Sequence, residues 1–99
     1  MFDWDDAKSN KNFVERGFDF EYASLIFEND TVERVDNRRD YQEERIIALG
    51  EIDSVVYCVV YTWRQGVRRI VSARVANRKE RNVYSQTISS GNPDTEGPG

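Results

Sequence analysis

The chain has 99 residues, of which 38% are hydrophobic and 32% are charged, a balance typical of one small folded domain. It contains no window of about 18 apolar residues, which excludes a membrane-spanning helix. Its acidic start, MFDWDD, lacks the basic and apolar regions of a signal peptide. The single cysteine, Cys58, lies in an apolar segment and is predicted to be a small buried hydrophobe. We therefore expect a cytoplasmic protein.

The net charge of −4 is unevenly distributed along the chain. Residues 1–45 carry a net charge of −6, residues 46–84 carry +4, and the remainder carries −2. Seven of the 14 Lys and Arg residues lie between Arg64 and Arg81, where Glu80 is the only acid. A chain with this distribution can bind an anion on one face and a basic partner on another, so its overall acidity does not exclude a nucleic-acid partner.

The first part of the chain predicts a short strand followed by two helices. Residues 2–4 alternate Phe, Asp and Trp, as an edge strand does. Asp5 is placed to cap a helix ending near Arg16, and Gly17 follows at the position that favours positive φ. Residues 20–27 predict a second short helix, because their apolar side chains recur at helical spacing.

The second part predicts strands over residues 31–35, 44–49, 55–62 and 67–74, with a charged loop at 36–40. Gly50 is expected to close the second of these strands, and short turns join the last three. Asn77 and Glu80 form a capping-box pattern that begins a helix over 78–86. The Ser-, Gly- and Pro-containing residues 89–99 predict a disordered tail, which leaves one domain at residues 1–88.

Short turns between strands indicate hairpins. We therefore predict an α+β domain, in which an antiparallel meander carries two N-terminal helices and one C-terminal helix on one face.

The chain has no histidine, which excludes Ser-His-Asp, Cys-His and His-ligated metal sites. Asp3, Asp5 and Asp6 leave open a carboxylate-only magnesium site, but they are more simply explained as a helix cap with favourable charges at a helix N-terminus. Guanidinium groups can stabilise the charge of a phosphorane, and a Tyr, Lys or Glu can transfer protons, so RNA cleavage without histidine is chemically open. A solvated basic surface is the structural alternative.

Strand alternation predicts that Arg69 and Val71 lie on one face of the last strand. Arg68, Ile70 and Ser72 are then expected on the other face, with Arg74 on the side of Ser72. On the final helix, Arg78 and Arg81 are expected to project into solvent, opposite the packing side.

The order of residues resembles the BrnT family of toxins over about residues 2–86. In the N-terminal half, the resemblance is carried by Trp4-Asp5, Lys8, Asn12, Gly17, Phe20-Glu21-Tyr22-Ala23 and Phe27. In the C-terminal half, it is carried by Glu44-Arg45, Gly50, Tyr61-Thr62, the segment from Arg69 to Arg74, Glu80-Arg81 and Tyr84.

This resemblance implies a metal-independent ribonuclease toxin of a type II toxin–antitoxin pair, with a compact fold similar to RelE and no cofactor. It implies a BrnA-like antitoxin as partner, RNA as substrate, and contact with promoter DNA only through the antitoxin complex. Carried over by position, Arg69, Arg74 and Arg45 are the expected catalytic residues. The residues expected to contact nucleic acid are Lys8, Asn12, Arg64, Arg78, Lys79 and Arg81.

Many members of this family carry Lys-His before the glycine, whereas this chain has Glu15-Arg16-Gly17. If that histidine contributes to catalysis, the chain is instead a catalytically weak or inactive binding module that acts through an antitoxin complex on promoter DNA. The two possibilities differ in whether the protein cleaves RNA.

Overall fold

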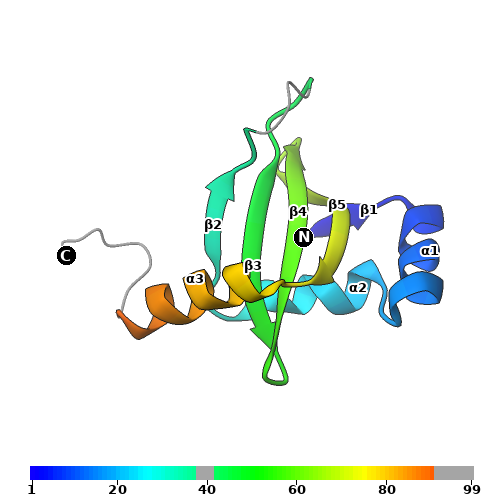
Figure 1. Ribbon diagram of the computed structural model, residues 1–99. Coiled ribbons are helices and arrows are strands. Elements are labelled where there is room, and N and C mark those ends of the chain that lie inside the picture. Colours follow the sequence, from blue (N-terminus) through cyan, green and yellow to red (C-terminus); the bar gives the residue numbers. More distant parts are fainter. Residues whose placement is uncertain (38–41, 91–99) are drawn as a thin grey trace.

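The computed structural model describes residues 1–37 and 42–90, and Figure 1 shows their arrangement. Most of the predicted charged loop and the tail from residue 91 lie outside the described residues, whereas residues 89 and 90 end the last helix. In chain order the elements are β1 (Phe2–Trp4), α1 (Asp6–Arg16), α2 (Phe20–Ala23), the 3₁₀ helix η1 (Ser24–Glu28), β2 (Val32–Val35), β3 (Ile46–Ile52), β4 (Val55–Arg64), β5 (Val67–Val75) and α3 (Arg78–Ser89).

The five strands form one mixed sheet in the order β1-β5-β4-β3-β2. Strands β2 to β5 form the antiparallel meander that the short turns predict. The N-terminal strand β1, however, pairs in parallel with β5, so the prediction of a purely antiparallel sheet is wrong. The parallel pairing is possible because the helical segment after β1 is long enough to carry the chain to β2, at the opposite edge of the sheet, without a hairpin.

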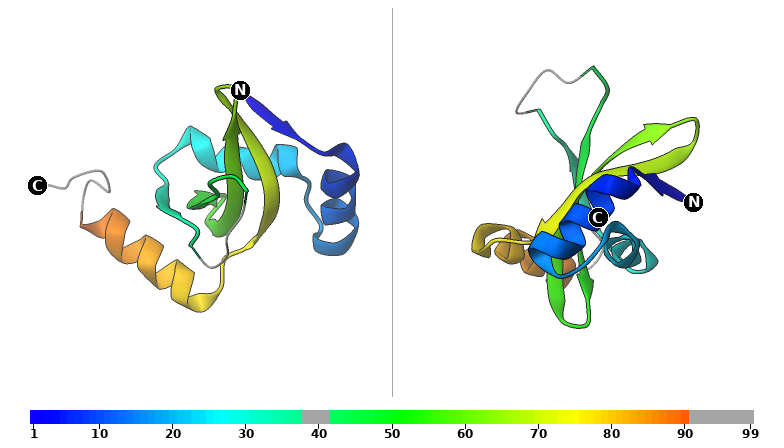
Figure 2. Two further views of the ribbon diagram at one scale, coloured as in Figure 1. Left: turned by 90° about the horizontal axis from the view of Figure 1, so that it is seen from above. Right: turned by 90° about the vertical axis from the view of Figure 1, so that its right-hand side faces the viewer.

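Helices cover both faces of the sheet, which corrects the prediction that they all pack on one (Figure 2). On the first, which we call the α2 face, α2 and η1 pack against Ala48, Tyr57, Val59 and Tyr61. On the opposite, α3 face, Tyr84 of α3 packs with Ile47, Leu49, Cys58 and Val60. Because β4 is apolar on both sides, it is the strand that both layers bury.

Strand β3 is longer than predicted, because it continues through Gly50 to Ile52. The turn after it consists of Asp53 and Ser54, which both take positive φ values, of 49° and 71°. Gly50 lies inside the strand because η1 approaches there: a Cβ at Gly50 would be 2.5 Å from the Cβ of Ile26. The glycine therefore permits a close packing contact, rather than a turn.

Both long helices begin where the sequence indicates. The Asp5 carboxylate accepts hydrogen bonds from the amides of Ala7 and Lys8, and Gly17 ends α1 with a φ of 88°. Asn77 and Glu80 form the complete capping box of α3, with both hydrogen bonds 2.9 Å long. These caps fix where the chain turns into a helix after each of the parallel strands β1 and β5.

Candidate functional site

A β-bulge in β5 places Arg69 and Arg74 on the same face of the sheet. The register shifts between Val60 and Tyr61 of β4, so that Ser72 pairs with Val60, Ile70 pairs with Tyr61, and Val71 has no opposite residue. Arg69 then lies opposite Thr62, and Arg74 opposite Cys58, on the α3 face. Regular alternation had predicted opposite faces for the two arginines, and this prediction is wrong because the bulge adds one residue between them.

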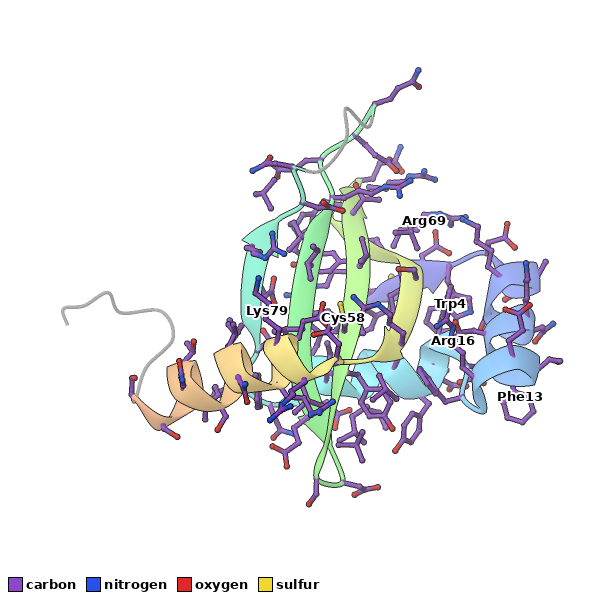
Figure 3. All side chains as sticks on the ribbon, in the orientation of Figure 1. Trp4, Phe13, Arg16, Cys58, Arg69 and Lys79 are labelled. Atoms are coloured by element: carbon purple, nitrogen blue, oxygen red, sulfur yellow. The ribbon has the colours of Figure 1, made fainter. Side chains whose placement is uncertain are left out.

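Arg69 is bound by a carboxylate from β1. Asp3 is its register partner across the parallel pair, and one Asp3 oxygen accepts a hydrogen bond from the guanidinium at 2.5 Å. This bond lowers the pKa of the Asp3 carboxyl below its usual value. The Arg69 side chain is 24% exposed and that of Asp3 is 52% exposed, so the pair lies at the surface where solvent screens it. Figure 3 shows Arg69 on the β1 side of the sheet.

Arg74 forms a bidentate pair with Glu80 from the first turn of α3. Its two terminal nitrogens each donate to a different Glu80 oxygen at 2.8 Å. The hydrogen bond from Arg74 is the main reason that the pKa of Glu80 is lowered, and the Asn77 amide adds to the effect. The capping box thus does two things: it begins the helix, and it holds the carboxylate that orients Arg74.

Arg45 and Arg64 lie near the end of the sheet at which Arg69 pairs with Thr62, away from Arg74. Arg45 immediately precedes β3, and its carbonyl accepts a hydrogen bond from the Asp36 amide at 2.8 Å. Arg64 ends β4 on the alternation that places Thr62 on the α3 face, and its guanidinium lies 3.3 Å from a Glu43 oxygen. The α3 face therefore receives Arg64 from β4 and Arg69 and Arg74 from β5, and Arg45 directly precedes β3.

A pocket of about 450 Å³ lies on this face between β2, β3 and the start of α3. Its floor is aliphatic, and its rim is polar and includes Glu80, which also binds Arg74. The pocket is thus directly connected to Arg74 of β5. The residues that line it are Val32, Arg34, Ile47, Leu49, Asn77, Lys79, Glu80 and Val83.

The other cations predicted to contact nucleic acid are distributed more widely. Arg78, Lys79 and Arg81 are exposed on the first turns of α3, and Lys79 lies over the sheet in Figure 3. Arg81 donates to the Ala76 carbonyl at 2.9 Å, which leaves it beside the helix start. Of these three, Lys79 lines the pocket.

Lys8 and Asn12 belong to α1, beyond the β1 edge of the sheet (Figure 1). Lys8 is exposed there. Asn12 is buried, and its amide donates to the Phe18 carbonyl at 2.9 Å, which connects α1 to the segment that leads into α2. The observed contact of Asn12 is therefore structural, and the structure does not bring it together with Arg45 or Arg64.

Arg16 occupies the position at which many BrnT toxins carry histidine. It lines a second pocket together with Phe13, Phe18 and other residues. Tyr57 of the α2 face also lines this pocket. That position is therefore not among the arginines of the α3 face.

Within residues 1–37 and 42–90, no cluster of three or more Cys, Asp or Glu side chains is arranged to hold a metal ion. Asp3 and Asp5 are engaged by Arg69 and by the α1 amides, respectively. Over the same part of the chain, no helix has the length and apolar character needed to cross a membrane.

The sequence did not predict that three further side chains contact this surface. Asp3, Glu43 and Arg34 meet the α3-face site only through strand pairing or loop closure. Asp3 is separated from Arg69 by 66 residues, so no local pattern links them. A residue whose partner depends on a parallel pairing has no signal in a single sequence.

The comparisons with known proteins identify the family. None of the curated proteins matches this chain. A family model described as the ribonuclease toxin BrnT of type II toxin–antitoxin systems matches residues 4–80. That segment contains β2 to β5, Arg69, both partners of the Arg74–Glu80 pair, and the capping box of α3, whereas Asp3 lies just before it. The chain therefore belongs to the BrnT family of ribonuclease toxins, whose members are paired with an antitoxin.

Proposed function

We propose that this protein is a metal-independent RNA endonuclease whose site is the α3 face, with Arg69, Arg74 and Arg45 as its catalytic residues. The observation that carries the proposal is the bulge at Val71, which aligns two arginines five positions apart on one face. Arg64 and Lys79 extend this basic surface along the backbone of the substrate. In this role the protein inhibits translation and growth in the cytoplasm until its antitoxin binds it.

The reaction we propose is attack of a 2′-hydroxyl on the adjacent phosphorus, in which the hydroxyl gives up its proton to solvent water. The bond from phosphorus to the 5′-oxygen breaks, which leaves a 2′,3′-cyclic phosphate and a 5′-hydroxyl end. Negative charge develops on the non-bridging oxygens of the pentacoordinate phosphorane, and guanidinium groups stabilise that charge electrostatically. Lys79 is the cation on the pocket rim that can protonate the leaving 5′-oxygen.

The carboxylates bound to these arginines do not prevent phosphate binding. A guanidinium has five N–H donors, and the hydrogen bond from Arg69 to Asp3 uses one of them. Glu80 holds Arg74 from one side with two bonds, which fixes the plane of its guanidinium. A substrate phosphate can therefore use the remaining donors of Arg69.

The same pairing favours one alternative function. If each carboxylate neutralises its arginine too strongly for RNA to compete, the protein is a catalytically weak binding module. It then acts with its antitoxin on promoter DNA, which only the complex retains in a salt-dependent manner. Arg64, Arg69 and Arg74 all have carboxylate partners in the structure, which is the observation behind this alternative.

A cleavage assay on total RNA with excess chelator distinguishes the two functions. We expect the wild type to cleave and Arg74→Ala to lose activity by about 10²–10³-fold, as for removal of one donor from a charge-stabilising site. Lys11→Ala is the matched control, because it removes an exposed cation from α1. Thermal melts verify that each variant is folded.

Each other outcome has a definite meaning. Folded and fully active Arg69→Ala and Arg74→Ala variants would show that the site is elsewhere. Cleavage that chelator abolishes would contradict metal independence. A wild type that binds antitoxin tightly but cleaves nothing would establish the binding module.

A further inference from the structure

We propose that the pocket between β2, β3 and α3 binds the nucleobase next to a phosphate on Arg74. This inference rests on the proposed function and adds to it a base-binding subsite, which makes the pocket the part of the surface that can discriminate between RNA sequences.

The floor of the pocket suits the faces of a planar base. Val32, Ile47, Leu49 and Val83 line it with aliphatic side chains. Ile47 and Leu49 are buried, whereas Val83 is 45% exposed and forms one wall from α3. Ligand pockets are typically apolar with a few fixed polar groups, and base faces are the apolar part of a nucleotide.

The rim supplies the fixed polar groups. The Asn77 side-chain oxygen accepts the Glu80 amide at 2.9 Å, which sets the orientation of the whole Asn77 amide. Its NH₂ group is a donor suited to carbonyl or ring-nitrogen acceptors on a base edge. Arg34 and Lys79 are exposed cations on the same rim. This charge favours an anionic nucleotide over a neutral apolar peptide as the occupant.

Glu80 connects the pocket to the phosphate-binding arginines. It lines the pocket and at the same time holds Arg74 through two hydrogen bonds of 2.8 Å. A phosphate on Arg74 is therefore adjacent to the pocket, and the base of the same or the next nucleotide can enter it.

The test is a methyl NMR titration of the wild type with a 2′-O-methyl dinucleotide, which cannot be cleaved because its 2′-hydroxyl is blocked. Ribose 5-phosphate, which has no base, is the comparison ligand. We expect the dinucleotide, but not the sugar phosphate, to shift the methyl signals of Val32, Ile47, Leu49 and Val83. Val83→Trp should fill the pocket and weaken dinucleotide binding by about tenfold, the scale of one lost base contact.

Val55→Trp is the matched control. Val55 is a similarly exposed valine, at 40%, but it lies at the β3–β4 turn away from the pocket. We expect it to bind the dinucleotide as the wild type does. Equal binding by Val83→Trp and the wild type would overturn the base subsite, and so would a dinucleotide that binds without shifting the methyl signals of the pocket.

The cleavage assay keeps this inference separate from the proposed function. If RNA is cleaved with chelator present and Val83→Trp cleaves with unchanged rate and sequence preference, the base subsite is wrong and the nuclease stands. If the wild type cleaves nothing while the pocket methyls still respond only to the dinucleotide, the nuclease is wrong and the base subsite stands. If neither ligand shifts any signal, the subsite is wrong.

Discussion

The two faces of the sheet surround the neighbouring residues Arg68 and Arg69 with different groups. Arg68 points to the α2 face, where its guanidinium lies 4.5 Å from the ring centre of Phe27 and 4.9 Å from that of Trp63. Arg69 points to the α3 face, where it meets the Asp3 carboxylate at the surface. The first arginine is part of an aromatic layer, whereas the second is paired with a carboxylate at the surface. Adjacent residues of one type thus have different roles, because α2 and η1 cover their face more fully than α3 covers the other.

The largest expected effect concerns the covered face. Phe20 is 2% exposed in the α2-face core, so Phe20→Ala should lower the free energy of unfolding by about 3–5 kcal/mol through lost burial and a new cavity. Phe13→Ala removes the same group from a site that is 59% exposed and should cost much less. Urea denaturation measures both, and similar losses for the two variants would contradict the assignment of the main core to the α2 face.

The Arg68 and Arg69 pair tests the comparison most directly. Arg68→Ala removes the cation from the rings of Phe27, Tyr61 and Trp63 and should cost about 1–2 kcal/mol of stability. RNA cleavage by this variant should remain. Arg69→Ala should show the reverse, with little loss of stability and a large loss of cleavage. Paired denaturation and cleavage assays measure both quantities, and a variant pair with interchanged effects would reverse the roles of the two faces.

Deletion of Val71 tests the bulge. Removing the unpaired residue leaves Ile70 opposite Tyr61 and Ser72 opposite Val60, so Arg69 and Arg74 should stay on the α3 face. We expect a loss of about 1 kcal/mol from the lost packing of Val71, with cleavage largely retained. In a regular strand, the same deletion would move Arg74 to the other face. A folded deletion variant without activity would therefore contradict the observed register.

The smallest expected effect is a change in acid stability. Because Arg74 lowers the pKa of Glu80 in the folded state, this carboxylate contributes stability that is fully present above the ordinary value of 4.5 and is lost as pH falls through the lowered value. Glu80→Gln keeps a capping-box side chain but removes the charge, so the difference between wild type and variant should shrink below pH 4.5. Thermal melts from pH 7 to pH 3 measure it, and a pH-independent difference would show that Glu80 acts only as a cap.

Much of the fold follows from local patterns in the sequence. Asp5, Gly17 and the Asn77–Glu80 box predict the ends of α1 and the start of α3, because caps depend on residues close in the chain. Gly50 predicts a turn in the sequence, and this prediction is wrong because the glycine instead permits close packing against Ile26, which is distant in the chain. Parallel pairing of β1 and the distribution of helices over both faces also depend on contacts between distant segments, which single-sequence patterns do not encode.

The site was predictable in composition but not in geometry. The density of arginines between Arg64 and Arg81 is visible in the sequence, and the family resemblance identified Arg69 and Arg74 as expected site residues. Arg69 and Arg74 lie on one face only because of the bulge. No residue pattern in β5 predicts that bulge, since Val71 fits a regular strand equally well. The roles of these arginines in cleavage stay predictions.

The parallel pairing of β1 with β5 has a consequence for the order in which the protein folds. The hairpins of the meander join segments close in the chain, whereas the bonds of β1 must wait for residues 68–70. During synthesis, β1 is thus the first strand to leave the ribosome and the last strand to pair with the sheet. Asp3 can hold Arg69 only after about two thirds of the chain has been made, so a nascent toxin completes its anion-binding surface late.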